Sequence, residues 1–156
     1  MITLEKLRSI LSYDPETGVW TWLDPPNHNT RLKGKQAGHS RADGYRQIRI
    51  DMKLYHAGRL AWFYMTSEWP IEEIDHIDRD PSNNKWTNLR EATSSQNKYN
   101  RDGSGLRGVY TNGISWWAMA GRNGYLGTFA TLEEASAARD KAVQELAGPF
   151  AELNSI

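Results

Sequence analysis

Apolar residues near the start of the chain recur at helical spacing and then give way to a turn and a strand. The helical positions are Leu4, Leu7, Ile10 and Leu11. With Thr3 as a candidate N-cap, this pattern predicts a short amphipathic helix over residues 4–12. Residues 14–18 are typical of a turn, which leads into the apolar stretch 19–22. The polar residues 24–43, rich in Pro, Asn and Gly, are expected to form a mobile basic loop.

The next apolar positions indicate a hairpin followed by a buried helix. Residues 44–50 and 53–56 have a strand-like pattern on either side of Asp51-Met52, and we expect the hairpin arginines to face outward. The dense apolar run at 60–65 then predicts a buried helix. Pro70 is expected to end that helix, because proline disfavours helical backbone in the residue before it.

The middle of the chain indicates a strand, a polar loop and a further helix. Ile74 and Ile77 bracket two polar residues as a short strand would, and residues 80–84 have the composition of a loop. A helix is expected to follow, capped near Thr87 or Asn88. One polar face of this helix gathers Thr93, Asn97 and Asn100. Its other positions, which can pack elsewhere, include Leu89, Ala92 and Tyr99.

The last third of the chain has a strand-rich pattern followed by one helix. The strand-like stretches are residues 109–110, 114–120 and 125–129. Asn123-Gly124 is a strong signal for a two-residue hairpin turn, and residues 131–134 form a capping box. The stripe expected to pack the helix on the sheet is Ala135, Ala138, Ala142, Val143 and Leu146. Gly148 and Pro149 are expected to stop the helix.

The amino-acid composition limits the classes of protein to which this chain can belong. A chain of 156 residues with 38% hydrophobic content and seven tryptophans is long enough for one domain or two small ones with real cores. The absence of cysteine excludes disulfides and cysteine-ligated zinc. No segment approaches the run of about 18 apolar residues that a membrane span needs, and the start of the chain lacks a signal-peptide pattern. We therefore expect a cytoplasmic protein, in a bacterial host cell if a phage encodes it.

The formal net charge of zero hides a gradient along the chain. Residues 31–59 hold eight basic side chains against Asp43 and Asp51, a net charge of +6, whereas the region from Glu133 onward is acidic. The basic residues are Arg31, Lys33, Lys35, Arg41, Arg46, Arg49, Lys53 and Arg59. Lys and Arg supply most of the nonspecific affinity for nucleic acid by neutralising phosphates. The hairpin within this region is thus a candidate phosphate-binding surface.

Residues 74–80 crowd carboxylates around a single histidine. Asp75 offers a hard oxygen ligand for a divalent cation, and His76 is the side chain whose ordinary pKa lets it take a proton near neutrality. Asn88 lies 12 residues after His76, and Asn97 lies 22 residues after Asp75. A calcium loop starting at Asp78 is the nearest competing interpretation, but that loop lacks the required Gly at its sixth position and Glu at its twelfth.

This ordered Asp-His, Asn, Asn series resembles HNH endonucleases, particularly the homing, phage-like type. The preceding Arg59-Leu60-Ala61-Trp62 and the following Asn88-Leu89-Arg90-Glu91-Ala92-Thr93 also resemble that family, and the likeness covers roughly residues 1–101. Related sequences usually place a histidine directly before the Arg-Leu-Ala-Trp run, whereas this chain has Gly58 there and its nearest histidine is His56.

The resemblance implies a ββα-metal nuclease domain with roles for particular residues. Asp75 and Asn97 would hold Mg²⁺ or Mn²⁺, and His76 would deprotonate the attacking water. Asn88 would orient the loop that carries the histidine. Arg59 could be a phosphate clamp or a structural ion-pair partner, and its place in the Arg-Leu-Ala-Trp run favours closeness to DNA, so it is included among the expected catalytic residues.

The C-terminal pattern of three strands and a helix resembles the Apetala-type DNA-binding domain of plant ethylene-response factors. The likeness rests on Arg107-Gly108-Val109-Tyr110, Trp116-Trp117-Ala118 and Tyr125-Leu126-Gly127-Thr128-Phe129. Domains are therefore expected at 1–101 and 104–156, in an α+β fold whose second part is a small three-stranded antiparallel sheet packed on one helix. The resemblance implies DNA contacts by Arg107, Tyr110, Trp116, Trp117 and Arg122, and the basic hairpin adds Arg41, Arg46, Arg49 and Lys53.

The sequence thus predicts a magnesium-dependent DNA endonuclease that nicks double-stranded DNA by phosphodiester hydrolysis. One alternative is a noncatalytic DNA-binding or regulatory protein that keeps the HNH fold, which the glycine at position 58 favours. Another is a phage structural or interaction protein, which predicts no salt-dependent affinity for DNA. The target sequence and the oligomeric state stay open.

Overall fold

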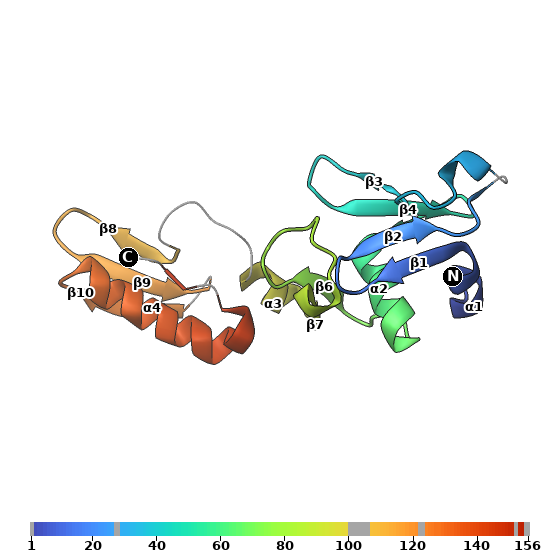
Figure 1. Ribbon diagram of the computed structural model, residues 1–156. Helices are drawn as coiled ribbons and strands as arrows, with labels where there is room; N and C mark the ends of the chain where they lie inside the picture. The colour runs from blue at the N-terminus through green and yellow to red at the C-terminus, as the bar shows by residue number, and fades with distance from the viewer. Residues whose placement is uncertain (1, 27–28, 100–106, 122–123, 152, 155–156) are drawn as a thin grey trace. The chain divides into compact units, whose positions relative to one another are not determined.

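Figure 1 shows the fold of the protein in a computed structural model. The structure describes residues 2–26, 29–99, 107–121, 124–151 and 153–154. The chain divides into two compact units, Met1–Ala92 and Thr93–Ile156. Both contain small antiparallel sheets and helices that pack against them, so the fold class is α+β. Within the described residues, no helix has the length and apolar character needed to cross a membrane.

The first unit begins with helix α1 and a hairpin. α1 (Leu4–Ile10) starts at Thr3, whose side chain accepts a hydrogen bond from the backbone N–H of Lys6 (3.3 Å), and it ends earlier than expected because Leu11 opens a strand. The strands are β1 (Leu11–Asp14) and β2 (Val19–Trp22), which pair in antiparallel register. Gly18 in the turn has φ of +72°, and a Cβ there would lie 2.4 Å from the backbone carbon of Asn84. Only glycine fits this close approach.

A three-stranded sheet follows, in the order β3-β4-β5. Its strands are β3 (His39–Ser40), β4 (Arg46–Ile50) and β5 (Lys53–His56). The β4–β5 hairpin is confirmed, and Asp51 and Met52 both adopt positive φ, as a two-residue turn of type I′ requires. The expectation of one mobile loop over residues 24–43 is wrong, since this stretch contains β3, the short 3₁₀ helix η2 (Thr30–Leu32) and the buried Ala37.

Helix α2 (Ala57–Thr66) closes the core of the first unit. It ends where Ser67 takes a left-handed conformation (φ 66°), so the expectation that Pro70 ends it is wrong. The largest fully buried side chains here come from α1, the first two sheets and α2: Leu7, Leu11, Trp20, Ile48 and Leu60. Burial of this apolar surface is the main driving force for the fold.

The last elements of the first unit are two paired strands joined by a long connection. They are β6 (Glu73–His76) and β7 (Leu89–Ala92), with the 3₁₀ turn η3 (Trp86–Asn88) directly before β7. The expected helix from Thr87 or Asn88 is therefore wrong over residues 89–92. Leu89 and Ala92 have the three-residue spacing of a helix, but pairing with β6 determines their conformation. Helix α3 begins only at Ser94 (Ser94–Tyr99).

The second unit has the expected three-stranded antiparallel sheet packed on one helix. Its elements are β8 (Val109–Thr111), β9 (Trp116–Ala120), β10 (Gly124–Phe129), α4 (Leu132–Ala147) and η4 (Gly148–Phe150). The capping box of Thr131 and Glu134 is confirmed. Leu146 is 64% exposed, so its expected packing on the sheet is wrong. The buried side of α4 instead includes Ser136 and Arg139.

Candidate active site

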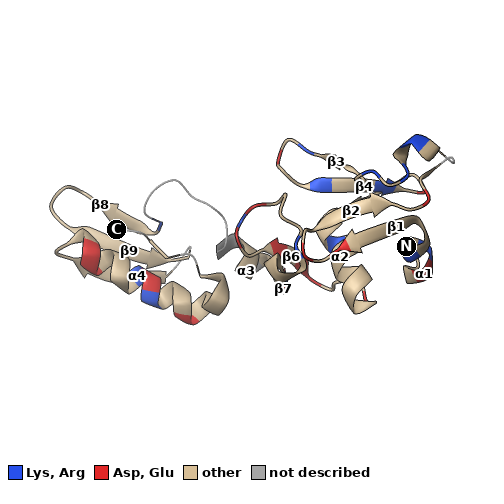
Figure 2. Cartoon of the chain, in the orientation of Figure 1, with Lys and Arg blue, Asp and Glu red and all other residues tan. Residues whose placement is uncertain are grey.

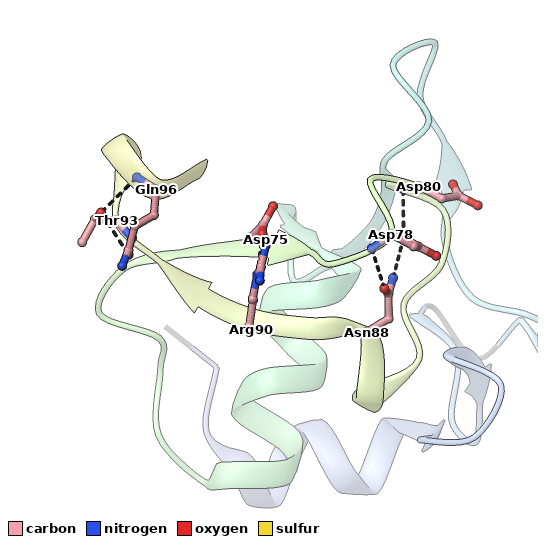
Figure 3. Close-up of polar contacts among 7 residues, drawn as sticks. All are labelled: Asp75, Asp78, Asp80, Asn88, Arg90, Thr93 and Gln96. Atoms are coloured by element: carbon pink, nitrogen blue, oxygen red, sulfur yellow. Dashed lines mark hydrogen bonds and ion pairs between the residues drawn. The ribbon is translucent and has the colours of Figure 1, made fainter. Parts of the chain in front are cut away.

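The two central residues, Asp75 and His76, end strand β6 and are buried, at 5% and 6% exposure. The register places Asp75 opposite Arg90 of β7. Oδ2 of Asp75 accepts a hydrogen bond from Nε of Arg90 at 2.7 Å, and Figure 3 shows the two side chains meeting across the strands. A buried carboxylate needs such a partner because removing its charge from water is costly.

The imidazole of His76 lies between an amide and an aromatic ring. Its Nε2 is 3.4 Å from Oδ1 of Asn84, and the ring of Tyr45 packs against it edge-on, with centroids 5.7 Å apart. Burial lowers the pKa of His76 below its usual value of 6.5, although the amide and neighbouring carboxylates act in the opposite direction. The ring is therefore neutral at pH 7, the form that can accept a proton.

Asn88 ties the β6–β7 connection together through three hydrogen bonds. Its Oδ1 accepts from the backbone N–H of Asp78 (3.0 Å), while its Nδ2 donates to Oδ1 of Asp78 (2.9 Å) and to the carbonyl of Asn83 (2.8 Å). Figure 3 shows Asn88, at the end of η3 directly before β7, reaching across to the loop. The loop-orienting contact expected of this asparagine is present, while its role in a reaction stays a prediction.

The carboxylates of the connection are engaged in local turns. Burial pushes the pKa of Asp78 upward, but hydrogen bonds from Asn83, the N–H of Asp80 and Asn88 outweigh it, so that the pKa is lowered. Oδ1 of Asp80 accepts from both the backbone N–H and the hydroxyl of Ser82, at 2.9 and 2.7 Å. These are Asx-type turns rather than a calcium loop. In the part of the chain that the structure describes, no group of three or more His, Asp or Glu side chains could hold a metal ion.

A second histidine, His56, lies against the same tyrosine as His76. The ring centroids of Tyr45 and His56 are 5.6 Å apart, and Nε2 of His56 is 3.3 Å from Nε2 of Gln47. Burial, together with the positive charges of Arg41 and Arg59, lowers the pKa of His56 despite the opposing charge of Asp43. The two imidazoles therefore border one site.

Gly58 is buried on the first turn of α2. A Cβ added there would lie 3.3 Å from Oδ1 of Asn84 and 3.5 Å from the side chain of Ile74. The position where the resemblance anticipates a histidine thus faces the amide that contacts His76. In this chain the backbone of α2 packs against that amide without an intervening side chain.

The side chain of Arg59 donates hydrogen bonds to backbone carbonyls within the first unit. Its Nη1 donates to the carbonyl of Glu72 (2.8 Å) and its Nη2 to the carbonyl of Pro70 (2.9 Å). These bonds anchor the segment between α2 and β6, which favours the structural interpretation of this arginine. Its expected closeness to DNA stays a prediction.

The basic hairpin presents some of its predicted residues to solvent. Arg41, Arg49 and Lys53 are exposed, and Arg41 forms an ion pair with Asp43 at 2.9 Å. Figure 2 marks the positions of the basic residues of this sheet in blue. Arg46 is half-buried and donates to the carbonyls of Ala37 (3.1 Å) and Gly38 (3.2 Å). The expectation that the hairpin arginines face outward is therefore wrong for Arg46.

In the second unit the predicted DNA-contacting aromatics divide between two faces of the sheet. Tyr110 and Trp117 stack with centroids 5.9 Å apart, whereas Trp116 packs against the core cluster between sheet and helix. The backbone N–H of Arg107 donates to Oδ1 of Asn154 (2.9 Å). Arg122 and Asn123, the predicted contact and turn residues, lie outside the described residues.

Asn97, the expected second metal ligand, belongs to the second unit. It lies on α3, where its backbone N–H donates to the carbonyl of Thr93 (2.9 Å). Its action as a ligand together with Asp75 stays a prediction. Asn100, the other candidate on this helix face, lies outside the described residues.

Three residues near the site were missed by sequence reasoning: Tyr45, Asn84 and Arg90. Arg90 falls directly opposite Asp75 only because residues 89–92 form a strand. The expected helix over these residues gave no reason to pair the two side chains. Asn84 resembles an ordinary turn residue, and only its 3% exposure distinguishes it. No sequence pattern around Tyr45 indicates that it lies against a histidine of the site.

Comparison with known protein families finds a match to part of the chain. The HNH endonuclease family model matches residues 55–99, the segment from the end of β5 through α3. No curated protein and no solved structure matches the chain. The matched segment contains His56, Asp75, His76, Asn88 and Asn97. The candidate active site therefore lies within the part of this chain that is similar to HNH endonucleases.

Proposed function

We propose that the protein is a metal-dependent DNA endonuclease of the homing, phage-like HNH type, which nicks double-stranded DNA. The observation that carries this proposal is the buried Asp75–His76 pair at the end of β6, with Asn88 tying the adjoining loop, inside the segment similar to HNH endonucleases. A neutral imidazole beside a carboxylate and a rigid polar loop suits general-base hydrolysis of a phosphodiester.

Each residue of the site has a proposed task. His76 accepts a proton from the attacking water, for which its lowered pKa keeps it in the neutral form at pH 7. Asn88 holds the loop through its bonds to Asp78 and Asn83, and so keeps the active-site backbone in place. Arg90 offsets the charge of Asp75 and holds its carboxylate in a defined orientation.

The donor set suits a hard divalent cation such as Mg²⁺ or Mn²⁺. The carboxylate of Asp75 is an oxygen donor of the kind that such ions prefer, and the resemblance to HNH endonucleases implies the amide oxygen of Asn97 as a second ligand. When bound, the ion would stabilise negative charge that develops on the scissile phosphate and the leaving oxygen. Because Arg90 pairs with Oδ2 of Asp75, this guanidinium and the ion would share one carboxylate.

The basic hairpin lies next to the candidate site. A Cβ added at Gly44, just before β4, would lie 2.7 Å from Cγ of Pro81 in the β6–β7 connection. The exposed Arg49 and Lys53 lie at the other end of this hairpin, beside the Asp51-Met52 turn, where they would bind phosphates farther along the DNA. The Apetala-like C-terminal sheet would dock on DNA elsewhere, through the stacked Tyr110 and Trp117.

A noncatalytic DNA-binding protein is the second candidate. The buried Gly58 favours it, since no imidazole faces Asn84 from α2. This candidate predicts salt-dependent DNA affinity without hydrolysis.

A plasmid-nicking assay with Mg²⁺ or Mn²⁺ separates the two candidates. His76→Ala should lower the nicking rate by about 10² to 10⁴-fold, the usual effect of removing a general base, and leave DNA affinity nearly unchanged. The matched control is His39→Ala, because His39 is an exposed histidine on β3. Nicking by the His76 variant at the wild-type rate would refute the assignment. Tight binding by the wild-type chain without metal-dependent nicking would establish the noncatalytic alternative.

A further inference from the structure

Asn84 is a buried amide, 3% exposed, at the end of the polar β6–β7 connection. Its Nδ2 donates to the carbonyl of Ser82 at 3.1 Å, which sets the orientation of the amide group. Oδ1 consequently faces Nε2 of His76, at 3.4 Å. An amide oxygen only accepts hydrogen bonds, so the facing ring nitrogen must be the one that carries hydrogen.

Other elements of the first unit hold this asparagine in place. The hydroxyl of Tyr13 on β1 donates to the backbone carbonyl of Asn84 at 2.7 Å. The turn at Gly18 approaches its backbone so closely that a Cβ would lie 2.4 Å away. Gly58 of α2 leaves room beside Oδ1, where a Cβ would lie only 3.3 Å from that oxygen. The amide is therefore fixed by the core as well as by its own loop.

We propose that Asn84 is a positioning residue whose Oδ1 keeps the proton of neutral His76 on Nε2 and hence the basic lone pair on Nδ1. This inference rests on the proposed nuclease function and names the nitrogen that acts as base. At 3.4 Å the contact is longer than a typical N–H···O bond of about 2.9 Å, so its contribution to fold stability is small. The effect that we assign to this contact is therefore the selection of the His76 tautomer that carries its proton on Nε2.

The tautomer determines how the proton moves in the proposed hydrolysis. The O–H bond of water breaks and its proton binds Nδ1, which gives an imidazolium that still donates from Nε2 to Asn84. The water oxygen forms a bond to phosphorus while the bond to the leaving 3′ oxygen breaks, and that oxygen takes a proton from solvent. A ring with its proton on Nδ1 would have its lone pair directed at an amide oxygen instead, where no proton is available.

The experiment is ¹⁵N NMR of the histidine rings in the full chain, at a pH where His76 is neutral, combined with nicking kinetics. We expect the wild-type His76 signals to show hydrogen on Nε2. Asn84→Leu, which removes the acceptor at similar volume, should populate the Nδ1–H form and lower kcat about 10- to 100-fold, while the Kd for DNA stays unchanged. Asn84→Asp, which keeps an oxygen facing Nε2, should restore the wild-type tautomer.

Asn83→Ala is the matched control. It removes the bond from Asn83 to Asp78 and loosens the same loop, but leaves the amide that faces His76. Its ring signals should match those of the wild type. Hydrogen on Nδ1 in the wild-type protein, or an unchanged tautomer in Asn84→Leu, would overturn the proposal, and the first result requires no variant to fold. A wild-type chain with the expected tautomer but no nicking would refute the nuclease and leave the tautomer assignment standing.

Discussion

Two antiparallel hairpins of the first unit, β4–β5 and β6–β7, are built alike and differ in how their strands are joined. β4 and β5 are joined by two residues, Asp51 and Met52, and this hairpin ends in exposed basic side chains. β6 and β7 are joined by residues 77–88, whose polar side chains bond to one another and to β6. A two-residue turn has too few side chains to surround a site, so the short hairpin offers only an exposed surface. A long connection has enough polar side chains to enclose a site.

The two hairpins also differ in how deeply their ion pairs are buried. One carboxylate of the long hairpin, Asp75, is buried against Arg90. Asp51 on the short hairpin pairs with Lys6 of α1, but both of these side chains are largely exposed, at 64% and 47%. Burial makes the first ion pair matter for stability, while solvent screens the second.

The largest effect is expected from breaking the buried pair. Arg90→Ala should lower the free energy of unfolding by about 3 kcal/mol, because it leaves a buried carboxylate without its guanidinium partner. Urea unfolding followed by tryptophan fluorescence measures this well, since five of the seven tryptophans lie between Trp20 and Trp86, in the first unit. The control, Lys6→Ala, should cost less than about 1 kcal/mol. Equal costs for the two variants would show that burial does not distinguish the hairpins.

The next effect concerns the polar bonds of the long connection. Asn88→Ala removes three hydrogen bonds and leaves the backbone N–H of Asp78 and the carbonyl of Asn83 without that partner. We expect the unfolding free energy to fall by about 2 kcal/mol and the nicking rate to fall with it. Thr87→Ala, an exposed neighbour on η3, is the matched control. A rate like that of the wild type would remove Asn88 from the proposed site.

The short hairpin and the C-terminal helix are the parts that sequence predicts well, and both owe their conformation to near neighbours. Asp51-Met52 separates two strand-like stretches, and Thr131 and Glu134 form their capping box within one turn. In each case the residues that determine the structure are adjacent in the chain. The local sequence pattern is then sufficient to predict the structure.

The long hairpin is the part that sequence predicts poorly. Leu89 and Ala92 fit a helix as well as a strand, and only pairing with β6 separates the two. The motif identified Asp75 and His76, but their partners Arg90 and Asn84 are brought to them by that pairing and by the loop. Tertiary contacts override local propensity at such positions.

A smaller effect should appear in the pH dependence of stability. Burial lowers the folded-state pKa of both His56 and His76 below 6.5, so the unfolded chain binds more protons as the pH falls through this value. Stability should therefore be full above pH 6.5 and decrease below it. The urea midpoint, measured from pH 8 to 5, should fall less steeply in a His56→Gln/His76→Gln variant. A wild-type midpoint that rises on acidification would contradict the lowered pKa values.

The smallest effect tests the short hairpin as a phosphate-binding surface. Arg49 and Lys53 are exposed there, and removing one phosphate-binding side chain should make the slope of log K against log salt shallower by about 0.9. Arg49→Ala/Lys53→Ala should thus weaken DNA binding at low salt and shift the slope by up to about twice that amount. The ring signals of His76 should be unaffected, because neither side chain touches it.

The control for this pair is Lys141→Ala, an exposed lysine on α4 in the acidic C-terminal region. It removes one positive charge from the chain without altering the hairpin, and its salt slope should equal that of the wild type. If the control and the hairpin variant change the slope alike, net charge alone governs binding and the β4–β5 hairpin has no special part in it. If only the hairpin variant changes it, the short hairpin binds phosphates while the long one holds the chemistry.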